Sequence, residues 1–345
     1  MNPLALTIFI ISLATGTTIV LSSYHWMLAW IGLEINTLAI IPMMTKNPHP
    51  RSIEAATKYF LTQATASALL LFSLLINAWA YGEWNINSPS PSMSIPLTIA
   101  LSTKLGVAPL HFWMPEVLQG IPLTTGLILA TWQKIPPMTL LIQISKDINL
   151  PLIITLGLTS IIIGGWGGIN QTQLRKIMAF SSIGHLGWMI IILKFNPQLT
   201  FLNFMLYIIM TSAMFITLHS LSATKITQLS SAWPKTPTLT VLSLLTLLSL
   251  GGLPPLTGFM PKLLIILELT KQNAQILAAS LLLFTLIALF FYIRLAYVMT
   301  LTLAPNTTPS TTMWRTNLMN HPIAALTTMF ALFLLPITPT LFLMT

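Results

Sequence analysis

The chain has 345 residues, of which 54% are hydrophobic and only 6% are charged. A soluble domain carries about 25% charged residues, so these totals exclude a soluble protein and indicate an integral membrane protein with very little soluble part. The formal net charge is +9. Because no basic cluster with interleaved aromatic residues is present, this charge indicates membrane orientation and no nucleic-acid surface.

Cysteine is absent, which excludes disulfides, cysteine-ligated iron–sulfur clusters and thiolate catalysis in this chain. No carboxylate or histidine cluster suggests a metal site. Met1 runs directly into an apolar segment without a basic n-region or a small-residue cleavage site, so we expect no cleavable presequence.

The apolar runs predict an all-α polytopic membrane protein with about 11 transmembrane helices in a single membrane domain, residues 1–345, since each crossing needs about 20 residues. In chain order we expect spans at residues 3–21, 24–44, 53–81, 95–114, 123–144, 150–169, 177–193, 199–221, 239–269, 274–303 and 322–344.

The loops between these spans alternate sides, and their basic residues are unequally divided. The N-terminal side carries Lys46, Arg51, Arg175, Lys176, Lys225, Lys235 and Arg315, whereas the opposite side carries Lys146, Lys194 and Lys271. Because basic loops stay on the cytoplasmic or matrix side, we expect the N-terminus there and the C-terminus on the other side.

Two spans contain proline- and glycine-rich interruptions, at residues 106–116 and 251–262. Proline removes a backbone donor and clashes with the preceding turn, so neither span can be a continuous helix. Broken backbone at membrane depth is tolerated only inside protein or beside a water-filled cavity, which is typical of an ion or substrate site. The candidate broken-helix residues are Gly106, Pro109, Gly251, Gly252, Pro254 and Pro255.

The two interruptions match each other at a constant offset of 146 residues, so that Gly106 falls on Gly252, Pro109 on Pro255, and Glu116 on Lys262. These matches predict two five-helix repeats, residues 1–145 and 146–303, followed by an extra C-terminal helix at 322–344. An odd number of helices inverts the second copy, and inverted repeats with matched broken helices are the architecture of secondary transporters. The alternative is that both segments are proline-kinked helices used for packing.

Five ionisable residues stand out because they lie well inside the predicted spans or directly after a break: Glu34, Lys104, Lys134, His185 and Lys262. A charge at the bilayer centre costs about 2.5–3.5 kcal/mol on insertion scales, so several at similar depth need partners or water. Glu34 is the only acid well inside a span, and Lys104 is its best partner by depth. We expect the five residues to form a row that passes protons through water, with a movable Glu34–Lys104 pair changing the proton affinity of the next lysine.

Each of these residues also has a structural interpretation. Glu34 and Lys104 could be a static packing pair, and His185 could be a core histidine with satisfied hydrogen bonds. Arg294 and Lys58 lie near span ends, where a long side chain can reach water.

Other features are also open to a structural interpretation. His111 and Trp113, beside the first break, could be structural or could line a pathway. The glycine-rich run at residues 164–168 is explained by close helix packing, because no strand–helix unit surrounds it as a nucleotide loop would require.

Four segments resemble a known family: Trp30-Ile-Gly-Leu-Glu34-Ile-Asn36, the segment at 104–117, Gln133-Lys134-Ile-Pro-Pro137, and the segment at 251–262. Together they resemble the antiporter-like proton-pumping subunits in the membrane arm of respiratory complex I, NADH:ubiquinone oxidoreductase. Within that family the chain resembles the mitochondrial members of vertebrates, and we expect a mammalian source. The resemblance covers essentially the whole chain.

The resemblance implies that Glu34 and Lys104 form the coupling pair, that Lys134 is the central proton-relay lysine, and that Lys262 lies nearest the output or the neighbouring subunit. It implies a multi-pass protein of the mitochondrial inner membrane, with its N-terminus in the matrix and its C-terminus in the intermembrane space.

The resemblance also implies what lies outside this chain. FMN, iron–sulfur clusters and ubiquinone are expected in other subunits, with no cofactor here. Expected partners are the chain 4 and chain 4L homologues, the lateral helix of chain 5, accessory subunits and inner-membrane lipids such as cardiolipin. The bacterial form has additional N-terminal spans that this chain lacks, which puts its lateral contacts in doubt.

Two other functions remain open from the sequence. The chain could be a free-standing cation/proton antiporter, because nothing in the repeat excludes one. It could also be a membrane scaffold with a vestigial channel, although a scaffold gains nothing from costly charges inside its spans.

Overall fold

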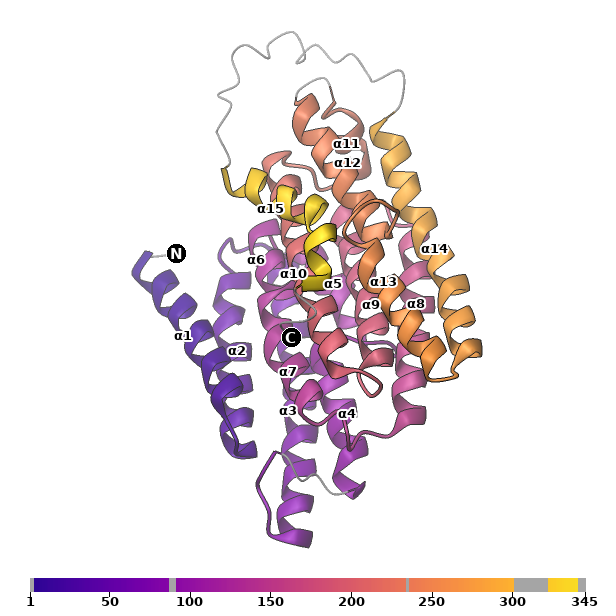
Figure 1. The fold of residues 1–345 in the computed structure, drawn as a ribbon. Coiled ribbons are helices and arrows are strands. Elements are labelled where there is room, and N and C mark those ends of the chain that lie inside the picture. Colours follow the sequence, from indigo (N-terminus) through magenta and orange to yellow (C-terminus); the bar gives the residue numbers. More distant parts are fainter. Residues whose placement is uncertain (1–2, 87–90, 234–235, 301–321, 341–345) are drawn as a thin grey trace. The chain divides into compact units, whose positions relative to one another are not determined.

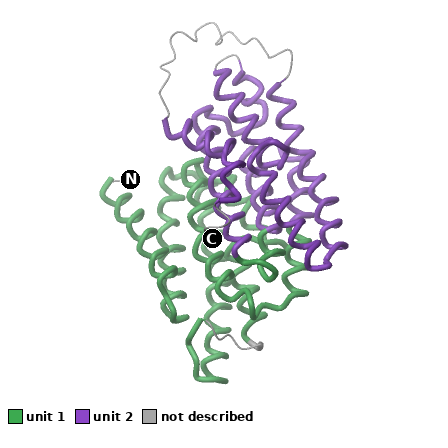
Figure 2. Tube along the Cα trace, viewed as in Figure 1, with its two compact units in different colours: residues 1–160, 189–197 green, residues 161–188, 198–345 purple. Residues whose placement is uncertain are grey.

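A computed structural model describes residues 3–86, 91–233, 236–300 and 322–340, and its secondary structure in these ranges is helical, with isolated β-bridges and no strand. The chain divides into two compact units, residues 1–160 with 189–197, and residues 161–188 with 198–345 (Figure 2). Within the described ranges, six helices are long and apolar enough to cross a membrane by length and composition. The loop residues Lys235 and Arg315 lie outside the described residues, as do 301–303 and 341–344 of the last two expected spans.

The first unit is built from long N-terminal helices and several short ones (Figure 1). Its elements are α1 (Pro3–Ser22), α2 (Trp26–Met44), α3 (Pro50–Tyr81), α4 (Pro91–Leu105), α5 (Trp113–Gly120), α6 (Leu123–Ala130), the 3-10 turn η1 (Trp132–Lys134), α7 (Ile135–Gln143) and the first half of α8 (Leu150–Ile169). Helices α2 and α3 begin where the side chains of His25 and His49 accept backbone N–H groups at 3.2 Å. These caps satisfy donors that the first helical turn leaves unpaired.

The second unit contains the remaining helices. Its elements are the second half of α8, most of α9 (Leu174–Ile192) and α10 (Pro197–Ser220), α11 (Ile226–Ser230), α12 (Pro237–Gly251), α13 (Phe259–Lys271), α14 (Gln275–Met299), α15 (Pro322–Phe333) and the 3-10 turn η3 (Leu335–Ile337). Helices α8 and α9 approach so closely that a Cβ on Gly164 would lie 2.7 Å from the backbone nitrogen of Gly184. This close approach agrees with the packing interpretation of the 164–168 run.

The helices follow the expected spans, with two differences. The span expected at 123–144 is not continuous, because α6 ends at Ala130 and η1 intervenes before α7. Pro136 and Pro137 have no N–H, so the carbonyls of Trp132 and Gln133 lose their usual donors four residues on. In the last span, α15 ends at Phe333, three residues before Pro336, for the same reason.

The first predicted break lies between α4 and α5. The N–H groups of Gly106 and Val107 both donate to the carbonyl of Ser102 at 3.0 Å, and Gly106 has a φ of +78°. This is the glycine-terminated helix end in which a left-handed residue lets two N–H groups satisfy the last carbonyls. The Ala108–Pro109 peptide bond that follows is cis.

The second predicted break, between α12 and α13, repeats this arrangement at the same 146-residue offset. The N–H groups of Gly252 and Leu253 donate to the carbonyl of Leu248 at 3.1 and 3.3 Å, Gly252 has a φ of +80°, and the Pro254–Pro255 bond is cis. The two breaks therefore share one backbone pattern. The division of the whole chain into two inverted five-helix repeats stays a prediction.

We expect Gly252→Ala to lower the apparent melting temperature of the assembled protein. A left-handed conformation costs an alanine about 1–2 kcal/mol, and the new Cβ would lie 2.7 Å from Lys262 Nζ, so the flexible end of that lysine must move. Thermal denaturation of the purified variants measures the effect.

Two matched glycines separate these causes. Gly82→Ala carries only the backbone strain, since Gly82 has a φ of +71° and nothing within 4 Å of an added Cβ, whereas Gly184→Ala carries neither strain nor contact. We expect the melting temperature to be highest for Gly184→Ala, lower for Gly82→Ala and lowest for Gly252→Ala. Equal values for Gly82→Ala and Gly252→Ala would contradict the contact with Lys262.

Candidate functional site

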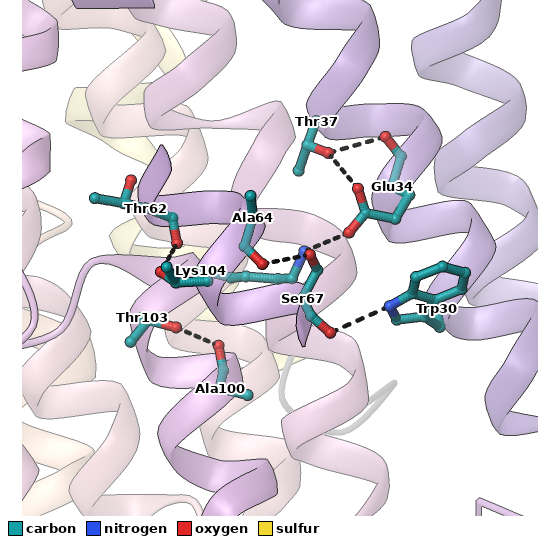
Figure 3. Close-up of polar contacts among 10 residues, drawn as sticks. Trp30, Glu34, Thr37, Thr62, Ala64, Ser67, Ala100, Thr103 and Lys104 are labelled. Carbon is teal, nitrogen blue, oxygen red and sulfur yellow. Dashed lines mark hydrogen bonds and ion pairs between the residues drawn. The ribbon is translucent and has the colours of Figure 1, made fainter. Parts of the chain in front are cut away.

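The first unit contains an ion pair at the positions expected from depth along the spans. Lys104 Nζ on α4 lies 3.9 Å from Glu34 Oε1 on α2 (Figure 3), with 3% of the lysine side chain and 25% of the glutamate side chain exposed. The hydroxyl of Thr37 donates to Glu34 Oε2 at 3.3 Å. The separation of 3.9 Å makes this a loose ion pair. This distance is compatible with both a static pair and a movable pair.

The neighbouring elements hold both members of the pair in place. On α2, Trp30 Nε1 donates to the carbonyl of Ser67 on α3 at 3.3 Å, one turn away from Glu34. Lys104 lies in the last turn of α4, where the unpaired carbonyls give a helix a partial negative charge that favours a cation. The break after α4 therefore helps to stabilise the lysine ammonium.

Lys134 lies in the unexpected break of the 123–144 span, and only 2% of its surface is exposed. Lys104 and Lys134 line one cavity of about 20 Å³, which is room for one water molecule. The cavity is lined by Leu33, Asn36, Thr37, Tyr59, Gln63, Lys104, Trp113, Leu129, Gln133, Lys134, Pro136 and Pro137. The structure thus brings Glu34, Lys104 and Lys134 together within the first unit.

The polar lining of this first cavity is suited to hydration. Gln63 Nε2 and Lys104 Nζ are both buried and have no hydrogen-bond acceptor among the described residues. Buried donors are almost always paired with protein or with ordered water, so a cavity with two such donors and room for one water is suited to hold an ordered water. Gln133 closes another side, donating from Nε2 to the carbonyl of Asn36 at 3.1 Å.

Trp113 has both of the roles considered from the sequence. Its Nε1 donates across the first break to the carbonyl of Thr103 at 3.1 Å, and its ring lines the first cavity, edge-on to Tyr59 at 5.6 Å between centroids. His111 is buried and its Nδ1 lies 3.3 Å from the carbonyl of Pro109. It does not belong to the cavity lining, which favours its structural interpretation.

His185 and Lys262 come together in the second unit. Both line a second cavity of about 20 Å³, together with Ser181 and Tyr292. Lys262 Nζ reaches back over the break and donates to the carbonyl of Gly251, the last residue of α12, at 2.7 Å. A larger pocket of about 250 Å³ on the other side of Lys262 is otherwise almost entirely apolar, so the polar cavity is the side suited to proton chemistry.

Two further cations, Lys58 and Arg294 near the span ends, have partners in the structure. Lys58 Nζ pairs with Glu54 Oε1 and Glu116 Oε2, each at 2.6 Å, and all three side chains are more than 40% exposed. Glu116, the counterpart of Lys262, therefore ties α5 to α3. Arg294 donates from Nη1 to the carbonyl of Ile169 at the end of α8. Both cations have found partners on neighbouring helices.

Sequence reasoning gave no role to several polar residues that line the two cavities, among them Tyr59, Gln63 and Gln133 in the first, and Ser181, Thr285 and Tyr292 in the second. The glutamines gave no clear signal, because Gln63 lies among threonines and a serine and Gln133 stands next to Lys134. Serine and tyrosine are common in membrane helices for packing, so their positions gave no signal either. The described residues contain no group of histidine, aspartate and glutamate that could hold a metal ion.

Family models match nearly the whole chain. Residues 23–289 match the model described as "NADH:quinone oxidoreductase/Mrp antiporter, TM", and residues 289–342 match "NADH dehydrogenase subunit 2 C-terminus". Similar proteins are named NADH-ubiquinone oxidoreductase chain 2. Those of Aquarana catesbeiana and Xenopus laevis are 69% and 60% identical, covering 100% and 98% of this chain and 100% and 99% of their own length.

The similar proteins include those of amphibians and fishes, among them Formosania lacustris at 58% identity over 99% of both chains. They agree with the expectation of a vertebrate chain and do not support its narrowing to a mammal.

Solved structures share the fold. A chain of respiratory complex I from Thermus thermophilus with bound aureothin has a TM-score of 0.83 at 24% identity, covering 97% of this chain and 80% of that one. A chain of the Mrp complex from Dietzia has a TM-score of 0.79 at 17% identity, covering 84% and 60%.

A double-mutant cycle tests the ion pair. Glu34→Gln leaves the buried ammonium of Lys104 without its counter-charge, whereas Glu34→Gln with Lys104→Met removes both charges. We expect the double variant to lose less stability than the single variants Glu34→Gln and Lys104→Met lose in total. The difference should be about 0.5–3 kcal/mol, as for other groups in contact. Melting temperatures of the assembled protein with each variant measure the coupling.

The matched control is the Glu54–Lys58 pair, which has the shorter distance of 2.6 Å but is exposed. Exposed pairs contribute little, so its coupling should be smaller than that of Glu34 and Lys104. The reverse order would show that Lys104 does not depend on Glu34.

Proposed function

This chain belongs to the NADH-ubiquinone oxidoreductase chain 2 family, and from that premise we infer that it is a membrane-arm subunit of respiratory complex I. In this role it translocates protons across the inner membrane, coupled to electron transfer from NADH to ubiquinone in the complex. It contributes to the enzyme as a proton-translocating subunit. One observation links this function to particular residues. Lys104 and Lys134 line the same cavity, and Glu34 forms an ion pair with Lys104.

We propose that Glu34 and Lys104 form the coupling pair and that Lys134 receives the next proton. While Glu34 stays beside Lys104, its negative charge stabilises the ammonium. When the pair separates, the proton of Lys104 can move through water in the shared cavity to Lys134. The hydroxyl of Tyr59 and the amides of Gln63 and Gln133 are the polar groups that would orient this water.

The energies involved are of compatible size. Moving one elementary charge against 100 mV takes about 2.3 kcal/mol, and residues in one ionic network couple by about 0.5–3 kcal/mol. Making and breaking one buried ion pair can therefore bias the movement of one proton. His185 and Lys262, which share the second cavity, extend the proposed row in the second unit.

The electron-transfer chemistry is assigned to other subunits. We place the iron–sulfur clusters outside this chain, because a sequence without cysteine supplies no thiolate for a cluster. The resemblance to complex I places FMN and ubiquinone in other subunits as well. The proposed neighbours are the chain 4 and chain 4L homologues, the lateral helix of chain 5 and accessory subunits. Large apolar side chains exposed along α1 and α14 are suited to neighbouring helices and to inner-membrane lipids such as cardiolipin.

The proposed location is the mitochondrial inner membrane. We place the N-terminus in the matrix and the C-terminus in the intermembrane space, because basic loop residues favour the matrix side and the expected number of spans is odd.

Lys134→Met tests the central role. Methionine keeps the length and apolar stem of lysine and removes the proton-carrying group, so we expect fewer protons to be translocated per electron while the complex still assembles. The measurement is the proton-to-electron ratio of the purified complex, or of a homologous complex, in liposomes. The matched control is Lys271→Met, the same change at a lysine whose side chain is 74% exposed. Normal assembly of the Lys134→Met complex with an undiminished ratio would sink the proposal and favour a scaffold.

The alternative of a free-standing cation/proton antiporter shares the family description. It predicts that the purified chain alone exchanges cations for protons in liposomes. We expect no exchange by the isolated chain and restored proton translocation only in the assembled complex. Exchange by the chain alone, measured with a pH-sensitive dye, would favour the antiporter.

A further inference from the structure

The apolar pocket beside Lys262, with a volume of about 250 Å³, lies within the second unit. Most of its lining is hydrocarbon, including Trp188 from α9, Leu267 from α13 and Leu282 from α14. Among the described residues that line the pocket, Lys262 alone carries a charge. An apolar cavity of about 150 Å³ holds benzene, so this pocket has room for part of a hydrocarbon chain.

The pocket reaches the apolar surface of the protein. Leu267 and Leu282 line it and are 48% and 47% exposed, whereas Trp188, which also lines it, is 3% exposed. The pocket therefore extends from the surface of α13 and α14 to a buried side chain of α9. Because α14 is long and apolar enough to span a membrane, a hydrocarbon chain can enter here from the bilayer without crossing water.

Lys262 has no carboxylate partner among the described residues. Its ammonium has three N–H donors, and the hydrogen bonds of the described part of the chain use one of them, to the carbonyl of Gly251 at 2.7 Å. The only acidic side chain that the sequence places in the second unit is Glu268, which lies 3.8 Å from Lys271. A cation inside a membrane is costly without a counter-charge, so the pocket is suited to an anionic group of another molecule.

The depth of Lys262 decides which anionic amphiphile fits the pocket. Lys262 precedes the end of α13 at Lys271 by nine residues, or about 14 Å of helix, which is close to half of a hydrocarbon core of about 30 Å. The charged phosphate of a phospholipid stays at the membrane surface, because a charge at the bilayer centre is costly. A carboxyl group takes up a proton in apolar surroundings and becomes neutral, so a carboxylic acid can reach Lys262 through the lipid.

We propose that this pocket binds a free fatty acid, with its hydrocarbon chain against α13 and α14 and its carboxyl group at Lys262. The acid arrives neutral and transfers its proton to the amine of Lys262, which leaves a carboxylate and an ammonium. The carboxylate then has the place at Lys262 that Glu34 has at Lys104. The bound acid keeps Lys262 protonated and slows the hand-over of protons, a consequence that rests on the proposed proton translocation.

Photolabelling of the assembled complex tests the binding site. The probe is palmitic acid with a diazirine on its chain, and mass spectrometry of the peptides locates the label. We expect the label on α13 and α14, and we expect excess palmitic acid to displace it where hexadecanol and phosphatidic acid do not. Lys262→Met should lower the labelling roughly tenfold or more, the effect of losing one hydrogen bond to a charged group.

Leu282→Trp and Leu283→Trp form a matched pair of variants. They place the same indole at adjacent exposed positions of α14, and of the two residues Leu282 lines the pocket while Leu283, which is 64% exposed, does not. We expect Leu282→Trp to abolish the labelling by filling the pocket and Leu283→Trp to leave it unchanged. Both variants keep Lys262, so the comparison stays informative if Lys262→Met fails to assemble.

The same two variants test the inhibition in liposomes. We expect palmitic acid to slow proton translocation by the Leu283→Trp complex at concentrations at which the Leu282→Trp complex is unaffected. A fatty acid also carries protons through the bilayer by itself, and this background is the same for both complexes. Equal slowing of the two complexes would contradict the inhibition.

Three results would overturn the binding site: no label on α13 or α14, equal displacement by hexadecanol or phosphatidic acid, and equal labelling of the two tryptophan variants. A neighbouring subunit that fills the pocket would give the first of these results. Lys134→Met tests the proposed function separately. An undiminished proton-to-electron ratio in that variant, with palmitic acid still bound at Lys262, would contradict proton translocation through Lys134 and support the binding site.

Discussion

A lysine ammonium buried within a membrane protein has lost its water and needs a replacement for it. The protein groups that replace this water around each lysine explain how the rest of the structure is arranged. Lys104 has the carboxylate of Glu34 and the carbonyl end of α4, and Lys262 has the carbonyl of Gly251 at the end of α12. Lys134 lies at an interrupted turn, facing a cavity with room for water. Lys104 and Lys262 are therefore stabilised by protein charge or carbonyl groups at the end of a helix, whereas Lys134 lies at the start of α7.

The interrupted helices supply unpaired carbonyl groups to the lysines, whereas the middle of an intact helix has no unpaired carbonyl. Inside a helix each carbonyl accepts from the N–H four residues on, and only the last four remain unpaired. A proline in mid-span creates such an end deep in the membrane, together with its partial negative charge. The prolines of the two predicted breaks therefore place helix ends with a partial negative charge beside Lys104 and Lys262.

The two predicted breaks share their backbone pattern but not their side chains. In the second, Lys262 folds back across the break to Gly251, whereas its counterpart Glu116 turns away to Lys58 on α3. In the first, the cation is Lys104, which precedes the break and whose counterpart is Leu250. The same type of backbone break is thus used twice, with the cation before the break in the first case and after it in the second. This difference suits two steps of a relay, with coupling at the first break and hand-over at the second.

The sequence by itself determined the helical membrane class, the five ionisable positions deep in the spans and the two glycine–proline breaks, because a polar group or a proline in an apolar run is costly wherever the chain folds. Only the tertiary structure decided which residues meet: Lys104 and Lys134 on one cavity, and Tyr292 beside Lys262. In water, an apolar stripe identifies the inward face of a helix. In a membrane both lipid and core are apolar, so the sequence carries little record of which way each helix faces. The break before Lys134 was missed for a related reason, since its prolines follow the lysine and the resulting turn depends on packing around it.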